Sequence, residues 1–69
     1  MTIGKLIKEL RLDESMTQME LGKAIGVSQK AIDYWERDVY EPKLSSVIAI
    51  IKYFELDYNE FFAELEKKL

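Results

Sequence analysis

The polar side chains between residues 28 and 37 offer the chemistry of hydrogen bonding to nucleic-acid bases and phosphates. Gln29 can form two hydrogen bonds with adenine, and Lys30 can donate to O6 and N7 of guanine. Tyr34 can contact a thymine methyl group or a phosphate. At 100° per residue, Lys30, Asp33, Tyr34 and Arg37 fall within one arc of a helix, so they can face the same partner.

The composition argues against an enzyme. The 69 residues contain no histidine and no cysteine, which removes the commonest general base, thiolate nucleophiles and the usual metal ligands. A glycine-rich phosphate loop, a cluster of carboxylates and a calcium-binding loop are also missing from the sequence. We therefore expect no catalytic residues, no metal and no cofactor, and no small-molecule ligand is evident.

The net charge of −3 comes from the C-terminal end of the chain. Residues 1–54 carry eight basic and eight acidic side chains and are neutral, whereas residues 55–69 carry five acidic and two basic ones. The location of a charge decides which partners it disfavours. The acidic C-terminal residues therefore do not exclude nucleic acid as a partner of the first 54 residues.

The length allows a single domain, residues 1–69. The longest apolar run, residues 47–51, is far shorter than the roughly 20 residues that cross a bilayer. The start of the chain has no basic segment followed by an apolar one, so we expect no signal peptide. With no cysteine for disulfides, a cytoplasmic protein is expected.

Two short helices separated by a very tight turn are predicted between residues 17 and 37. Thr17 and Glu20 form a capping box that starts the first of these helices. Gly26 ends it as a left-handed residue. Ser28 then caps a second helix over residues 29–37, whose inward face carries Ile32 and Trp35. Two short helices joined in this way are typical of a helix-turn-helix.

Apolar residues recur at three and four positions throughout the chain, which predicts an all-α fold, a compact bundle of five helices. Thr2 caps a first helix, and residues 44–54 form the most apolar one. The last helix starts at Asp57 in a second capping box, with Glu60. Its apolar residues are Tyr58, Phe61, Phe62, Leu65 and Leu69.

This pattern resembles the phage-repressor and Cro-like helix-turn-helix family, bacterial and phage regulators also called xenobiotic-response-element proteins. The shared positions are Thr17, Gln18, Leu21, Gly22, Ile25, Gly26, Val27, Ser28, Ile32, Trp35, Glu36 and Pro42. The family usually has alanine at Gly22, where a small residue lets the two helices approach. Asp38 stands where glycine is common, and aspartate tolerates a left-handed backbone better than most residues. The resemblance implies a lambda-repressor-like DNA-binding domain with its helix-turn-helix at the second and third helices.

The resemblance also implies which residues meet DNA. The glutamine matching Gln18 binds a backbone phosphate in the family, at a helix N-terminus that favours anions. Lys43, before the fourth helix, is a candidate of the same kind. The full expected set is Thr17, Gln18, Ser28, Gln29, Lys30, Tyr34, Arg37 and Lys43. Each has a structural alternative. Thr17 is a cap, Lys30 alone is an ordinary exposed charge, and Asp33 with Arg37 at i,i+4 forms a helix salt bridge.

We expect the partner to be a double-stranded, palindromic DNA operator, bound by a homodimer of a transcriptional regulator, in most cases of this family a repressor. The chain has more aromatic residues than a domain of this size buries, so the last helix is the expected dimer surface. The residues expected there are Tyr58, Phe61, Phe62 and Leu65. The alternative is a protein-interaction module on the same fold, such as an antitoxin, an antirepressor or an adaptor, because fold does not fix function.

Overall fold

Five α-helices and no strand make up the part of the chain that the structure, a computed structural model, describes, residues 1–67. The helices are α1 (Ile3–Asp13), α2 (Gln18–Ile25), α3 (Gln29–Glu36), α4 (Leu44–Tyr53) and α5 (Tyr58–Glu66). The predicted all-helical fold is confirmed. The third and fourth helices end one residue earlier than expected, because Arg37 and Phe54 are their C-caps. Leu69, expected on the last helix, lies outside the described residues.

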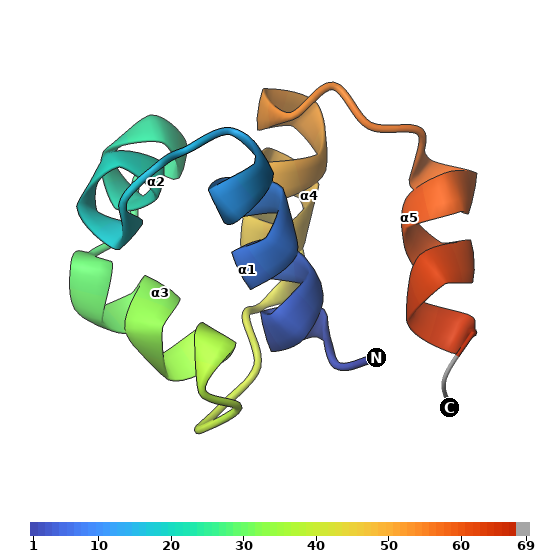
Figure 1. Cartoon of the computed structure of the whole chain (residues 1–69), viewed down its shortest axis with the longest axis horizontal. Coiled ribbons are helices and arrows are strands. Elements are labelled where there is room, and N and C mark those ends of the chain that lie inside the picture. Colours follow the sequence, from blue (N-terminus) through green and yellow to red (C-terminus); the bar gives the residue numbers. More distant parts are fainter. Residues whose placement is uncertain (68–69) are drawn as a thin grey trace.

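The centre of the molecule is the pair α1 and α4, with α2 and α3 on one side and α5 on the other (Figure 1). The core follows this arrangement, and its buried residues form two clusters. The first contains Ile7, Leu21, Ile32, Trp35 and Ile50, and the second contains Leu6, Val47, Ile51 and Phe61. The neighbours Leu6 and Ile7 of α1 thus serve different clusters. Of the helices in residues 1–67, none is long and apolar enough to cross a membrane.

Side-chain caps start four of the helices. Thr17 accepts a hydrogen bond from the Glu20 backbone N–H at 3.0 Å, and the Glu20 carboxylate accepts from the Thr17 N–H at 2.8 Å. The predicted capping box is therefore present. Thr2 and Ser28 also accept from the backbone three residues on. At α5, Asp57 accepts from the Glu60 N–H, but α2 has the only complete capping box in the described chain. The expected box at Asp57 is thus half of one.

Four helices end with a residue in the left-handed region. Gly26 has φ 79°, as predicted, and Asp38 has φ 60°. Ser15 and Glu55, at φ 54° and 56°, have the same conformation but were not expected to. After each of these residues the next N–H reaches back to a carbonyl in the last turn, as from Met16 to Arg11 at 3.0 Å. This bond satisfies a carbonyl that the helix leaves free, and it offsets the strain of a non-glycine residue at positive φ.

Two glycines allow backbones to touch. A Cβ on Gly4 of α1 would lie 1.8 Å from the carbonyl oxygen of Trp35 in α3. A Cβ on Gly22 of α2 would lie 2.7 Å from the carbonyl oxygen of Val27, in the turn before α3. The close approach expected at Gly22 is therefore present. The one at Gly4 fixes how α3 lies across α1.

Candidate nucleic-acid interface

The outer face of α3 is polar and its inner face is apolar. Ile32 is fully buried and Trp35 is 4% exposed, so both belong to the core as expected. Gln29 and Lys30 are exposed at the start of the helix. Ser28 is exposed too, but its hydroxyl oxygen already accepts from the Ala31 N–H at 3.0 Å. The first turn of α3 thus presents the amide of Gln29 and the amine of Lys30 to a partner.

The half-buried ring of Tyr34 makes cation–π contacts with both cations of this face. Lys30 Nζ lies 5.5 Å from the ring centroid and Arg37 Cζ lies 5.4 Å from it. Tyr40 packs edge-on against the same ring, with the centroids 5.4 Å apart. Attraction to the ring quadrupole limits the freedom of both long side chains before any partner arrives. Lys30, Tyr34 and Arg37 therefore form one cluster, as the helical arc predicted.

Asp33 and Arg37 form the helix salt bridge that the i,i+4 spacing predicted. Arg37 Nη2 lies 2.9 Å from Asp33 Oδ2, and Arg37 Nε donates to the same oxygen at 3.0 Å. These bonds, followed by one from Gln18, hold the pKa of Asp33 below its ordinary value.

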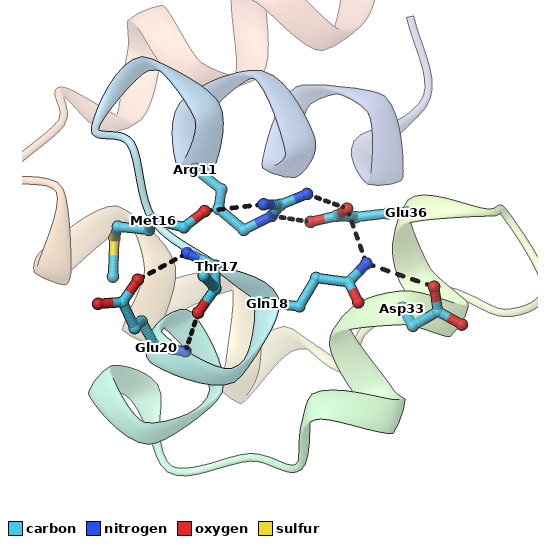
Figure 2. Close-up of polar contacts among 7 residues, drawn as sticks. All are labelled: Arg11, Met16, Thr17, Gln18, Glu20, Asp33 and Glu36. Atoms are coloured by element: carbon cyan, nitrogen blue, oxygen red, sulfur yellow. Dashed lines mark hydrogen bonds and ion pairs between the residues drawn. The ribbon is translucent and has the colours of Figure 1, made fainter.

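The side chain of Gln18, the first residue of α2, points at two carboxylates of α3 (Figure 2). Its Nε2 donates to Glu36 Oε1 at 3.1 Å and to Asp33 Oδ1 at 3.3 Å. Both amide hydrogens are thereby used within the protein, and only the acceptor Oε1 remains. A phosphate offers only acceptors, so a phosphate contact by this amide requires Gln18 to exchange partners.

A buried ion pair that the sequence did not reveal supports these residues. Arg11 Nε lies 2.7 Å from Glu36 Oε2, and Arg11 Nη2 donates to Glu36 Oε1 at 2.8 Å (Figure 2). Arg11 Nη1 also donates to the carbonyl of Met16, just before α2, at 2.8 Å. The hydrogen bond to Glu36 raises the pKa of Arg11, against the effect of burial. One guanidinium therefore joins α1, the start of α2 and the end of α3.

A sequence signal for this pair did exist. Arg11 stands four positions after Ile7, and Glu36 stands four positions after Ile32, so each charge continues a buried stripe. Opposite charges on two inward faces are expected to pair, because a lone buried charge is costly. The pattern does not say which two helices meet.

Thr17 and Lys43 stand apart from the cluster on α3. The hydroxyl oxygen and the backbone N–H of Thr17 are both engaged with Glu20, which is the structural alternative for this residue. Lys43 is exposed and occupies the N-cap position of α4, where it makes no side-chain cap hydrogen bond. The contacts described for residues 1–67 do not tie Lys43 to α3, so its assignment stays a prediction.

The expected dimer surface on α5 needs one correction. Phe61 is only 4% exposed and packs in the second core cluster with Leu6, Val47 and Ile51, so it is not available to a second chain. Its neighbour Phe62 is 41% exposed and Tyr58 is 45% exposed. Leu65 is half-buried. The helix thus contributes one aromatic side chain to the core and leaves two exposed at its surface.

The described part of the chain holds no group of three or more carboxylates that could bind a metal ion. A surface groove of about 750 Å³ lies between the N-terminus, the loop after α3 and α5. Its apolar lining includes Val39, Tyr40 and Phe62. The groove is thus an open apolar surface.

Comparisons with known proteins agree with this geometry. A family model described as helix-turn-helix matches residues 7–61. The HTH-type transcriptional regulator PuuR of Escherichia coli (strain K12) is 31% identical to this chain over 64 residues. That match covers 93% of this chain and 35% of PuuR, so the chain spans about a third of the length of this relative.

Two solved structures have the same fold. The P22 c2 repressor protein, in complex with a synthetic operator, gives a TM-score of 0.78 at 31% identity, over 88% of this chain and 92% of the repressor. The restriction-modification controller protein C.Esp1396I gives 0.80 at 29% identity, over 96% and 86% of the two chains. On the matched residues and on these structures, the chain belongs to the helix-turn-helix family, in the phage-repressor and Cro-like group that its sequence resembles.

Proposed function

We propose that this chain is a sequence-specific DNA-binding domain of a cytoplasmic transcriptional repressor that binds a palindromic operator as a homodimer. The observation that carries the proposal is the outer face of α3. Gln29 and Lys30 are exposed in its first turn, and the ring of Tyr34 holds Lys30 and Arg37 on the same face. In a helix-turn-helix, the N-terminal residues of this helix meet base edges in the major groove. No enzymatic activity is proposed.

Gln29 and Lys30 are assigned to base contacts, because an amide and an amine can each make two directional hydrogen bonds to a purine. Arg37, Lys43 and Gln18 are assigned to phosphates, and Gln18 must exchange its partners Asp33 and Glu36 to make this contact. Ser28 retains a hydroxyl proton for a phosphate oxygen, whereas Thr17 can offer its own only by giving up its hydrogen bond to the Glu20 carboxylate. Tyr34 contributes its edge and hydroxyl, since cations lie against its ring.

Few cations are available for DNA contact. Lys30 and Arg37 lie on this face, and Lys23 and Lys43 are proposed to contribute as well. Each neutralised phosphate releases counterions and contributes about −0.9 to the slope of the logarithm of the binding constant against the logarithm of the salt concentration. Four cations therefore give a slope no steeper than about −4 per protomer. Non-specific binding is accordingly weak, and specificity depends on base contacts. A steeper slope would show that more basic residues reach the DNA than we assign.

The homodimer is proposed to form through Tyr58, Phe62 and Leu65 of α5. Two exposed aromatics one helical turn apart make an apolar stripe, and apolar area drives most protein association. The dimer would set the two α3 helices about 34 Å apart, one turn of B-DNA. Sedimentation equilibrium of wild type and Tyr58→Ser/Phe62→Ser tests this. We expect a dimer that the double variant converts to monomer, and a monomeric wild type at micromolar concentration contradicts it.

The decisive experiment for DNA recognition is selection of binding sites from random duplex DNA at two salt concentrations. Wild type should enrich a palindromic consensus. Gln29→Ala/Lys30→Ala should lose it while keeping its melting temperature, because both side chains are exposed. A folded double variant that selects the same consensus would remove α3 from recognition.

A second candidate function is a protein-interaction module, favoured by the apolar groove that Val39, Tyr40 and Phe62 line. This function predicts no enriched DNA sequence even at low salt. It also predicts that Gln29→Ala/Lys30→Ala leaves activity intact, whereas changes on α5 abolish it.

A further inference from the structure

Asp33 is the one carboxylate on the outer face of α3, and both of its oxygens are occupied by residues assigned to DNA contacts. Oδ1 accepts from Gln18 Nε2 at 3.3 Å. Oδ2 lies 2.9 Å from Arg37 Nη2 and accepts from Arg37 Nε at 3.0 Å. The other carboxylate of the helix, Glu36, is buried against Arg11.

This arrangement opposes DNA binding in two ways. A phosphate must compete with a carboxylate that already neutralises Arg37 and already accepts from Gln18. The carboxylate itself repels phosphates, and it reduces the charge of the face from two cations, Lys30 and Arg37, to a net charge of one.

Resting on the proposed function, we propose that Asp33 restrains Gln18 and Arg37 in the free protein and so weakens their contacts with DNA phosphates. Random DNA offers phosphates but few correct base contacts, so it gains little from displacing Asp33. An operator supplies the base contacts of Gln29 and Lys30 in addition, and these offset the loss of the Asp33 bonds. Removal of the charge therefore strengthens binding to random DNA, and it lifts the same cost from binding to the operator.

The test compares wild type, Asp33→Asn and the control Glu9→Gln, which removes one exposed carboxylate from α1 and keeps the net charge equal to that of Asp33→Asn. The probes are a random-sequence duplex and the consensus duplex from the selection, titrated at several salt concentrations. We expect Asp33→Asn to bind random duplex about threefold more tightly, in keeping with the strength of one exposed ion pair. Its salt slope should steepen by about one. Glu9→Gln should shift both duplexes equally and only slightly.

Two further measurements separate the causes. In Asp33→Asn/Arg37→Gln, the gain on random duplex should disappear, because the freed cation is missing. In the free proteins, nuclear magnetic resonance should show that the Arg37 Nε–H and the Gln18 side-chain amide shift in Asp33→Asn and not in Glu9→Gln. Unshifted signals would show that the restraint does not exist in solution.

The outcomes distinguish this inference from the proposed function. If wild type binds the consensus but Asp33→Asn binds random duplex with unchanged affinity and slope, the role of Asp33 is wrong and the DNA-binding function stands. If neither protein binds any duplex at low salt, the DNA-binding function is wrong and the role of Asp33 fails with it.

Discussion

The α2–α3 pair and α5 attach to the same centre, α1 with α4, by different means. The α2–α3 pair is held by buried apolar residues and also by polar bonds of fixed geometry, among them the Arg11–Glu36 ion pair and the amide of Gln18. In the described part of α5, Phe61 is the single buried residue, while Tyr58 and Phe62 stay exposed.

The difference agrees with the two partners proposed for these sides. Hydrogen bonds to base edges depend on direction, so side chains that read DNA must be held at defined positions before contact. Association through apolar area is not directional, so a dimer formed through α5 would depend on exposed aromatic surface more than on fixed geometry. Polar order on one side and apolar surface on the other thus suit two kinds of partner.

The largest effect is expected from Glu36→Ala. The variant leaves the Arg11 guanidinium buried without its carboxylate, and it should lose about 3–5 kcal/mol of unfolding free energy. Urea denaturation followed by circular dichroism measures the loss. The double variant Arg11→Met/Glu36→Leu is the control and should be far closer to wild type. A single variant within about 1 kcal/mol of wild type would mean that polar bonds do not hold the α2–α3 side.

The neighbours Phe61 and Phe62 give the matching test for α5. Phe61→Ala should cost about 3 kcal/mol, because it empties a buried site next to Leu6, Val47 and Ile51. Phe62→Ala should cost less than about 1 kcal/mol in the monomer, since its ring is largely at the surface. Both are measured by urea denaturation under conditions that keep the protein monomeric. Equal losses of unfolding free energy would mean that both rings pack in the core. The contrast between the α2–α3 pair and α5 would then not hold.

A smaller loss is expected from Gly4→Ala, which tests the backbone contact between α1 and α3. The new methyl would meet the Trp35 carbonyl at 1.8 Å, so the helices must separate, at a cost of about 2 kcal/mol. Gly22→Ala, with its nearest oxygen at 2.7 Å, should cost less. Thermal melting ranks the two variants. If Gly4→Ala melts above wild type, the gain in helix propensity outweighs the contact.

The smallest effect concerns pH and the capping box of α2. The N–H and hydroxyl of Thr17 lower the pKa of Glu20 in the folded protein. A folded pKa below the unfolded value of about 4.3 gives stability that is present above that value. It is lost as the pH falls through the folded pKa. The pKa of Asp33 is also lowered, so Asp33 contributes to stability in the same direction. Its contribution is the same in wild type and in a variant of Glu20.

Glu20→Gln should therefore lose less stability than wild type between pH 6 and pH 3, because glutamine completes a capping box without titrating. The urea midpoint at the two pH values measures the difference. An equal fall in both proteins would show that the Glu20–Thr17 bonds have no part in acid destabilisation.

Local chemistry along the chain determined most of the fold. Caps at Thr2, Thr17 and Ser28, and the left-handed positions of Gly26 and Asp38, involve residues close in sequence, so short-range rules predict them. The apolar period placed Ile32 and Trp35 inside and the polar cluster of α3 outside. The Asp33–Arg37 bridge was also predictable, since its partners are one turn apart.

Only the tertiary structure decided the rest. Arg11 pairs with Glu36 across 25 positions, and Gln18 turns its amide to Asp33 and Glu36, because the crossing of α1, α2 and α3 brings these residues together. Tertiary packing also chose Phe61 over Phe62 for the core. Phe61 and Phe62 are both large and apolar, so the local sequence does not say which of them is buried. The orientation of α5 against α1 and α4 decides this, and that orientation depends on residues far apart in the sequence.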